Sequence, residues 1–222
     1  MRVLVGCEFS GAVRRAFRDA GHDAWSCDLL PAGDGSPFHY QEDVLGIMHE
    51  GWDLGIFFPP CTYICSSGMH WTTRGLRDRK LTEDALGFVE MLMKAPIPMI
   101  AIENPVGAIS TRIRKPDQII HPWQFGHPES KTTCLWLKNL PLLKPTLVLD
   151  KPSSGVWSNQ TPSGQNKLGP SERRWAERSK TYQGIAEAMA SQWSSPQIAR
   201  PVQTVVNHGA QLTLNIMQIA HA

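Results

Sequence analysis

The chain has 222 residues, of which 41% are hydrophobic and 19% are charged, and its formal net charge at pH 7 is +2. This length and composition suit one globular domain, or one domain with a small lobe, and exclude a disordered chain. No apolar run approaches the roughly 18–20 residues that cross a bilayer, and the first residues lack the long apolar core of a signal peptide. The five cysteines are odd in number and scattered, so they predict reduced thiols. We therefore expect a soluble cytoplasmic protein.

Charge is unevenly distributed along the chain. Residues 1–111 carry 9 Lys and Arg against 14 Asp and Glu, whereas residues 112–180 carry 12 against 5. The basic stretch is a candidate surface for a polyanion such as nucleic acid. On charge alone, a solvated surface of mixed sign explains the same counts equally well.

Strands and helices alternate in the first half of the chain. Apolar stretches predict strands at residues 2–7, 24–27, 53–58, 98–102 and, further on, 133–137. Apolar side chains at helical spacing predict helices at residues 11–20, at 82–94 with Thr82 as the N-cap, and from Gly184 to about residue 193. Residues 141–169 are rich in Pro, Ser, Gly, Asn and Gln and predict a loop. The alternation indicates βαβ units and a mostly parallel sheet.

Residues that carry chemistry stand where predicted strands end. In open α/β sheets ligands bind beyond the carboxyl ends of the strands, so Asp28, Cys61 and Glu103 are expected to meet at one cleft. Two prolines fix the turn before Cys61 and hold its thiol at the cleft, although a free cysteine is also commonly a small buried hydrophobe. Partial desolvation would raise the pKa of Glu103 and keep it protonated near neutral pH, although an ordinary loop glutamate fits the same position.

Several short segments follow one another in a recognisable order. They are Phe9-Ser10-Gly11, Asp28, Asp43-Val44, Pro60-Cys61, Glu103-Asn104, residues 127–133 and residues 182–186. In this order they resemble the DNA (cytosine-5) methyltransferases, most specifically in the Pro-Cys and Glu-Asn pairs. The resemblance covers residues 2–193 and is closest to the compact phage and prophage type with a reduced target-recognition region.

The resemblance implies a Rossmann-like α/β fold of the S-adenosylmethionine-dependent methyltransferases, with a mostly parallel sheet, helices on both faces and a small irregular basic lobe. It divides the chain into a catalytic and cofactor-binding core at 1–137, a target-recognition region at 138–180, a returning helix at 181–195 and a tail at 196–222. The chain departs from the family pattern in four places. The second glycine of the first motif is missing, Lys131 is the only basic residue of the later basic motif, Pro105 follows the Glu-Asn pair, and the target-recognition region is short.

Roles for individual residues follow from the resemblance. Cys61 is implied to add to cytosine C6, Glu103 to bind N3, Asn104 and Pro60 to order the catalytic loop, and Lys131 to act as a cation near the base or phosphate. The implied cofactor-binding residues are Glu8, Phe9, Ser10, Gly11, Asp28, Leu29, Asp43, Val44, Pro59, Tyr182 and Gln183. The implied nucleic-acid-binding residues are Arg112, Arg114, Lys115, Lys131, Arg173 and Arg174. Four tryptophans are available to stack, namely Trp123, Trp136, Trp157 and Trp175, of which Trp136 is expected in the core.

The implied activity is transfer of a methyl group from S-adenosylmethionine to C5 of cytosine in DNA, with base flipping, by a monomer without metal in a bacterial or phage-infected cell. Three alternatives stay open. The same fold could act on single-stranded DNA, RNA or a nucleotide, the chain could be a non-catalytic module that binds cofactor or nucleic acid, or it could be an unrelated thiol enzyme that uses Cys61 with His70. Cys61, Cys65 and His70 are also part of a zinc pattern, but a fourth ligand at usual spacing is missing.

Overall fold

The computed structural model describes residues 1–169, 171 and 174–194 and contains a single seven-stranded sheet. Its strands are β1 (Arg2–Gly6), β2 (Asp23–Asp28), β3 (His39–Gln41), β4 (Leu54–Phe57), β5 (Met99–Pro105), β6 (Gln118–Ile120) and β7 (Thr133–Lys138). They lie in the order β3-β2-β1-β4-β5-β7-β6. The first five strands are parallel, while β7 runs antiparallel to both of its neighbours. The prediction of a mostly parallel α/β sheet is confirmed.

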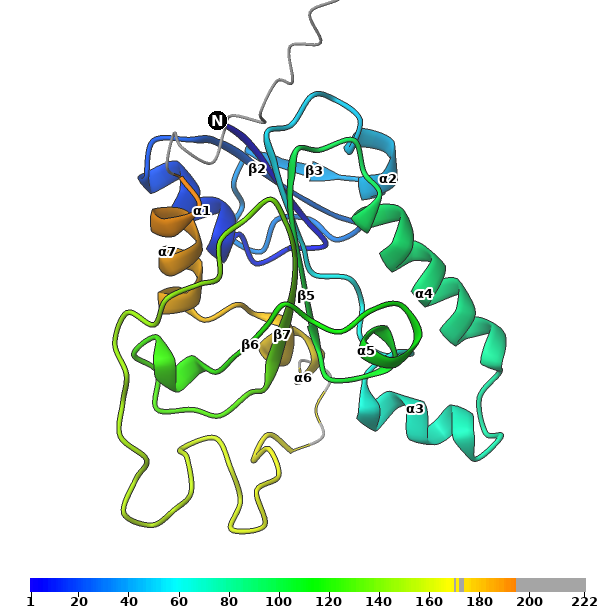
Figure 1. Ribbon diagram of the computed structural model, residues 1–222, viewed down its shortest axis with the longest axis vertical. Helices are drawn as coiled ribbons and strands as arrows, with labels where there is room; N and C mark the ends of the chain where they lie inside the picture. The colour runs from blue at the N-terminus through cyan, green and yellow to red at the C-terminus, as the bar shows by residue number, and fades with distance from the viewer. Residues whose placement is uncertain (170, 172–173, 195–222) are drawn as a thin grey trace, which may run out of the picture.

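Helices cover both faces of this sheet (Figure 1). They are α1 (Ala12–Asp19), α2 (Val44–Ile47), α3 (Ser66–Thr73), α4 (Arg79–Met93), α5 (Ala108–Arg112), α6 (Arg174–Ser179) and α7 (Gln183–Gln192), with a 3-10 turn at Pro122–Gln124. One hydrophobic cluster joins the sheet to α1 and α7 through Phe17 and Met189. The other joins it to α2 and α4 through Ile47 and Leu86. Each fully buried side chain of this kind contributes about 1.5–3 kcal/mol, so packing on two faces holds the sheet rigid.

Two boundaries differ from the sequence predictions. Helix α4 begins three residues before Thr82, because Asp78 is its N-cap and accepts a hydrogen bond from the Lys80 N–H at 2.9 Å. The prediction of Thr82 as the cap is wrong: its side chain is buried and its hydroxyl donates to the Tyr63 carbonyl at 3.0 Å. Strand β5 continues beyond the apolar run, so Glu103 lies inside the strand rather than after it.

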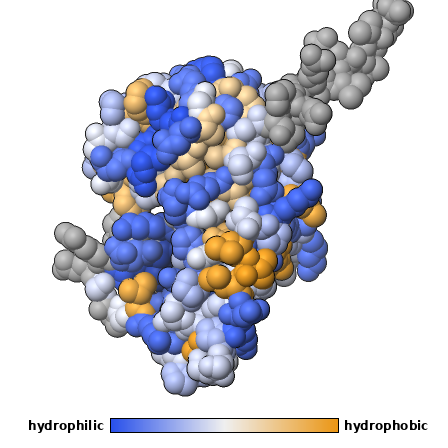
Figure 2. Space-filling model, turned by 90° about the vertical axis from the view of Figure 1, so that its left-hand side faces the viewer, coloured by the Kyte–Doolittle hydropathy of each residue, from blue (hydrophilic) through white to orange (hydrophobic). Residues whose placement is uncertain are grey.

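The segment between β7 and α6 is irregular from residue 139 to 169, as its composition predicts. It is fixed to the segment before β7 by reciprocal hydrogen bonds between Asn159 and the Ser130 backbone, at 2.9 and 3.0 Å, and by the stacked rings of Trp123 and Trp157. Trp136 is in the core, as expected. The segment exposes apolar side chains, and Figure 2 shows an apolar area on the side of the molecule where it lies. The exposed large apolar residues of the segment are Leu142, Leu147, Val148 and Leu168.

Within the described residues, no helix has the length and apolar character required to cross a membrane. The tail predicted at residues 196–222 lies outside the described part of the chain.

Candidate active site

The order of the strands reverses between β1 and β4. From β1 the chain continues to β2 and β3 on one side, and then returns to β4 and β5 on the other. The carboxyl ends of β1 and β4 therefore border the crevice in which open α/β sheets bind ligands. The two ends are joined directly, since the Phe58 N–H donates to the Gly6 carbonyl at 3.0 Å. The segments that leave this crevice, residues 7–11 and 58–65, carry many of the predicted site residues.

Cys61 lies after β4 on a turn that hydrogen bonds hold from two sides. The buried Asn104 side chain on β5 donates from Nδ2 to the Pro59 carbonyl at 2.7 Å. The backbone N–H groups of Ile64 and Cys65 donate to the Cys61 carbonyl at 3.1 and 2.9 Å. Because these contacts fix the backbone before and after Cys61, its half-buried thiol has a defined position at the edge of the sheet.

Glu103 lies on β5 and lines a small pocket together with Phe58, Lys131, Thr133 and Tyr182. Burial raises the pKa of the Glu103 carboxyl above its ordinary value, and the Lys131 charge and a hydrogen bond from Thr133 offset this only in part. A carboxyl of this kind retains its proton to higher pH and can donate it to a bound ligand. Glu103 and Lys131 also act electrostatically on the Cys61 thiol, in opposite directions.

Cys61 and Cys65 are joined through the backbone, since the Cys65 N–H donates to the Cys61 carbonyl at 2.9 Å. Interaction with Cys65, burial and the Glu103 charge raise the pKa of the Cys61 thiol above its ordinary value. Interaction with Cys61 lowers the pKa of the Cys65 thiol, assisted by Ser67, whose hydroxyl lies 3.3 Å from the Cys65 Sγ.

One wall of the pocket is formed by two segments that are distant in the sequence, and they contribute Lys131 and Tyr182 to its lining. The Tyr182 hydroxyl donates to Glu129, and the Gly184 N–H donates to Nε2 of His127 at 3.0 Å. Lys131 Nζ donates to the Arg178 carbonyl at 3.3 Å. These contacts join residues 127–133 to the start of α7, which packs on α1 (Figure 1). The predicted residue Gln183 is exposed at this point.

Three of the predicted cofactor residues surround the carboxyl ends of β1 and β2. Asp28 ends β2, and Asp43 caps α2 by accepting the Leu45 N–H at 3.0 Å. Burial raises the pKa of the Cys7 thiol, and the charges of Asp28, Cys27 and Asp43 raise it further. Leu29 is 73% exposed beside Asp28. A carboxylate next to an exposed apolar side chain fits a nucleoside, which needs a partner for its hydroxyls and one for its ring.

Other predicted cofactor residues contribute through the backbone or the core. Glu8 is buried and accepts the Val13 N–H at 2.8 Å, the Arg14 N–H at 3.4 Å and the Ser10 hydroxyl at 3.3 Å. Its carboxylate therefore caps α1, and burial raises its pKa to about 7. Gly11 begins α1 with φ of 68°, where an added Cβ would contact the Arg14 guanidinium. Three further predicted cofactor residues are Phe9, Val44 and Pro59. The Phe9 carbonyl accepts the Gly33 N–H, and Val44 and Pro59 are buried.

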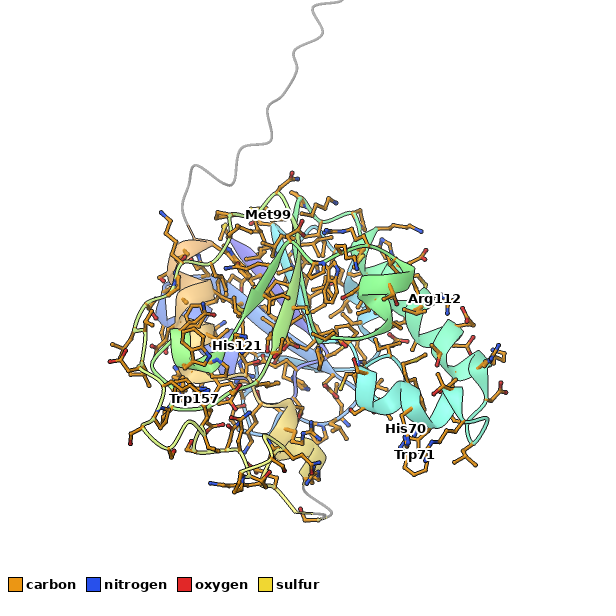
Figure 3. The ribbon with its side chains drawn as sticks, turned by 60° about the horizontal axis from the view of Figure 1, so that its bottom comes forward. His70, Trp71, Met99, Arg112, His121 and Trp157 are labelled. Carbon is orange, nitrogen blue, oxygen red and sulfur yellow. The ribbon has the colours of Figure 1, made fainter. Side chains whose placement is uncertain are left out.

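The predicted nucleic-acid-binding residues are dispersed over the surface. Arg112 pairs with Glu83 and Arg114 pairs with Asp117, both at 2.8 Å. Figure 3 shows Arg112 on the side of the molecule opposite His121 and Trp157. Lys115 is exposed and Arg174 begins α6, whereas Arg173 lies outside the described residues. Lys131 is the member of this set that lines the pocket.

Sequence reasoning missed two contributors to the site. The spacing of Cys65 four residues after Cys61 was visible in the sequence, but the turn that joins the two residues, held by the hydrogen bond from the Cys65 N–H to the Cys61 carbonyl, was not predicted. Arg178 on α6 acts on Cys65 through its charge, which no local pattern signals. Among the described residues, no group of three or more His, Cys, Asp or Glu side chains is arranged to hold a metal ion.

Comparison with known proteins identifies no family. No protein-family model matches the chain, and no curated protein matches it. Among solved structures, it is similar to a DNA modification methyltransferase encoded within an E. coli prophage, with a TM-score of 0.44 and 16% sequence identity. The match covers 70% of this chain and 53% of the other, so this chain spans about half of that protein's length. A likeness this weak carries no functional argument, and function has to be argued from the site.

Proposed function

We propose that this protein transfers a methyl group from S-adenosylmethionine to C5 of cytosine in DNA, with Cys61 as the nucleophile. One observation carries the proposal: a carboxyl of raised pKa and a cation, Glu103 and Lys131, line one pocket, and both act electrostatically on the thiol of Cys61, which comes from a third segment. These are the three kinds of group that the resemblance to DNA (cytosine-5) methyltransferases requires.

The chemistry explains why these groups belong together. Cytosine C5 is a poor nucleophile, and addition of a thiolate at C6 makes it enamine-like. Glu103 holds a proton that it can give to cytosine N3 as Cys61 adds, which prevents a full negative charge from building up on the ring. Lys131 lies near both groups and stabilises the Glu103 carboxylate after this proton transfer. Asn104 keeps the Cys61 turn in place through Pro59.

The residues at the carboxyl ends of β1 and β2 fit the cofactor. Asp28 would hold the ribose hydroxyls, Asp43 the adenine, and the exposed Leu29 side chain would cover the ring. When bound, S-adenosylmethionine supplies the electrophilic methyl group. Cys7 directly after β1 has φ of 59°, which is uncommon for a residue with a Cβ.

Access to C6 requires the target base to leave the helix stack, at a cost of a few kcal/mol. Between β7 and α6 the described residues contain no helix or strand that could enter a major groove. We therefore expect recognition of a short sequence, about two to four base pairs, or of DNA shape. The same feature favours a second candidate, single-stranded DNA or RNA, whose bases need no flipping.

The decisive experiment traps the covalent adduct. DNA that contains 5-fluorocytosine should become attached to the protein in the presence of S-adenosylmethionine, because fluorine at C5 cannot leave as a proton does. Peptide mapping should locate the bond at Cys61, Cys61→Ala should abolish it, and Glu103→Gln should slow it strongly. Cys134→Ala, at a buried cysteine on β7, is the matched control and should leave trapping intact.

The same assay with single-stranded DNA and RNA identifies the preferred polymer. Attachment at Cys134 or Cys65, or methylation without any adduct, would contradict the assignment of Cys61. Absence of both binding and methylation with every polymer would reject the proposed activity altogether.

A further inference from the structure

The loop at residues 29–38, which joins β2 to β3, is held by a buried arginine on α1. Arg14 is 1% exposed, and its guanidinium donates from Nη1 to the Ser26 hydroxyl on β2 at 3.1 Å and from Nη2 to the Asp34 carboxylate of the loop. Arg15 donates to the same carboxylate at 2.7 Å from the surface of the helix. Arginine is almost never buried this deeply unless it is paired, so the contact with the loop is part of how the fold is built.

A chain of hydrogen bonds continues from this arginine to the backbone of the loop. The Ser26 hydroxyl lies 2.8 Å from Nδ1 of His39, and Nε2 of His39 lies 2.9 Å from the Leu30 carbonyl oxygen. Because Arg14 can only donate, Ser26 accepts from it and gives its own proton to Nδ1 of His39. In the neutral ring Nε2 then carries the proton and donates to Leu30. The loop is therefore tied to α1 at Asp34 and again at Leu30.

The loop also contacts the segment that follows β1. The Gly33 N–H donates to the Phe9 carbonyl at 2.7 Å. Gly11 leaves the room that this arrangement needs, because a Cβ there would clash with the Arg14 guanidinium and would lie 2.9 Å from Asp34 Oδ2. The glycine that begins α1 therefore lets the helix and the loop approach each other.

The loop presents to solvent the part that the cofactor would contact. Leu29 is 73% exposed, although its carbonyl accepts a hydrogen bond from Gln41 Nε2 at 3.4 Å. Asp28 Oδ1 accepts the Leu30 N–H at 3.0 Å, while Oδ2 of the same carboxylate has no hydrogen-bond partner among the described residues. A fixed backbone therefore carries an exposed apolar side chain beside a carboxylate oxygen that can accept from a hydroxyl group.

We propose, on the basis of the proposed function, that Arg14 is a positioning residue for the cofactor. By holding the loop, it keeps Leu29 and Asp28 in place before the nucleoside binds. Arg14 acts through Asp34 and through the hydrogen bonds that lead to Leu30, and it touches no reacting group. A site that is ordered in advance binds more tightly, because binding does not have to order the loop. If loss of Arg14 lowers the fraction of chains with the loop in place to about a tenth, the apparent affinity falls about tenfold.

The first test measures the order of the loop in the absence of cofactor. Hydrogen–deuterium exchange of the free protein, read by mass spectrometry, should be about tenfold faster in Arg14→Met than in the wild type for the peptide that spans residues 28–38. Exchange in β5 and α4 should be the same in both proteins, which shows that the variant is folded. Equal exchange of the loop peptide in the two proteins would overturn the proposal.

The second test measures the binding of S-adenosylmethionine by calorimetry. Arg14→Met should weaken binding about tenfold. Asp34→Asn, which keeps an acceptor for the Ser36 N–H but not for Arg14, should weaken it by less. The double variant should bind no more weakly than Arg14→Met, because both changes remove the same ion pair. Losses that add in the double variant, or unchanged affinity in both single variants, would overturn the proposal.

The matched control for the ion pair is Asp84→Asn. This change breaks the exposed pair of Asp84 with Lys80 on α4, and the variant should bind S-adenosylmethionine as the wild type does. A loss in Asp84→Asn as large as in Asp34→Asn would overturn the proposal, because it would show that removing any surface carboxylate weakens binding.

A pair of variants at His39 separates positioning from general destabilisation. His39→Gln can still donate to the Leu30 carbonyl, whereas His39→Leu has no donor. Binding should be weakened in His39→Leu and largely retained in His39→Gln. Equal losses in the two variants would overturn the path from Arg14 to Leu30. In the methylation assay Arg14→Met should raise the KM for S-adenosylmethionine and leave kcat at saturating cofactor near the wild-type value.

These outcomes distinguish this inference from the proposed function. Binding of S-adenosylmethionine that depends on Arg14, without methylation of cytosine in any polymer, would support the role of Arg14 and reject the proposed function. Methylation whose KM for S-adenosylmethionine is the same in the wild type and in Arg14→Met would support the proposed function and overturn the role of Arg14.

Discussion

The hydrogen bond from Asn104 to Pro59 allows a direct test of how the Cys61 turn is held. In Asn104→Ala the Pro59 carbonyl remains buried and loses its donor, which costs about 1–3 kcal/mol. One effect offsets part of this cost. Asn104 Oδ1 is itself buried and finds no partner among the described residues, so its removal relieves an unsatisfied acceptor. We therefore expect a loss near the lower end, about 1–2 kcal/mol in the free energy of unfolding.

Urea unfolding at neutral pH measures this loss, and thermal unfolding should show a midpoint lower by about 2–8 °C for a chain of this length. Asn166→Ala is the matched control, because Asn166 is exposed and only accepts the Leu168 N–H; it should change stability by less than about 0.5 kcal/mol. Equal losses in the two variants would refute the reasoning.

Asn104→Asp makes the test sharper. The ionised carboxylate offers only acceptors to the Pro59 carbonyl, whereas the protonated carboxyl can donate as the amide does. Burial raises the folded-state pKa of such a carboxyl above its unfolded value, so the stability of the variant should be greatest at low pH and should fall as pH rises through that interval. A variant that tolerates high pH as well as the wild type does would show that the contact with Pro59 is unimportant.

Three further predictions concern single positions. Gly68→Ala should destabilise the protein by about 1–3 kcal/mol in urea unfolding, because the new Cβ would lie 2.0 Å from the Thr62 carbonyl oxygen. Gly87→Ala, in open space on α4, should stabilise it by about 0.5–1 kcal/mol. A Gly68→Ala protein more stable than the Gly87→Ala protein would contradict the packing. The pKa of Glu8 is raised from 4.5 to about 7, so its ionisation costs folding stability as pH rises across that interval. Between these pH values the wild type should lose more stability than Glu8→Gln, by about 3 kcal/mol at most. Parallel pH profiles of the two proteins would argue against a buried carboxyl. Asp28→Ala should weaken S-adenosylmethionine binding in calorimetry about tenfold or more, as expected for a lost charge-assisted hydrogen bond. Asp23→Ala, at an exposed position, is the control and should bind as the wild type does. Unchanged affinity in Asp28→Ala would show that the cofactor does not bind at the end of β2.

The strands that were predicted correctly are those with continuous apolar runs. A strand buried on both faces of a sheet, such as β1 or β4, must be apolar at every position, and this pattern is visible in the sequence. Strands β3 and β6 have three residues each and are partly exposed, so they leave no such run. The end of β5 was misplaced because its last residues are held by pairing with β7, an interaction between segments about 30 residues apart.

The candidate site was predictable to the extent that strand ends meet. Parallel strands deliver their carboxyl ends to one edge, so the meeting of Cys61 with Glu103 follows from the fold class alone. The role of Glu8 does not follow in the same way. Its position after β1 suggests a ligand contact, but its side chain turns back to the buried first-turn N–H groups of Val13 and Arg14. This orientation depends on the conformation of the intervening turn.

The same distinction explains Cys65. A spacing of four residues brings two side chains together only if the chain between them is helical, and two prolines before Cys61 do not reveal whether the following residues form a turn or extend. The hydrogen bond between the Cys65 N–H and the Cys61 carbonyl shows that these residues form a turn. Arg178, which is more than 100 residues away in the sequence, acts on Cys65 through its charge. Short-range patterns therefore identify which groups carry the chemistry, whereas the proton distribution between those groups depends on long-range contacts.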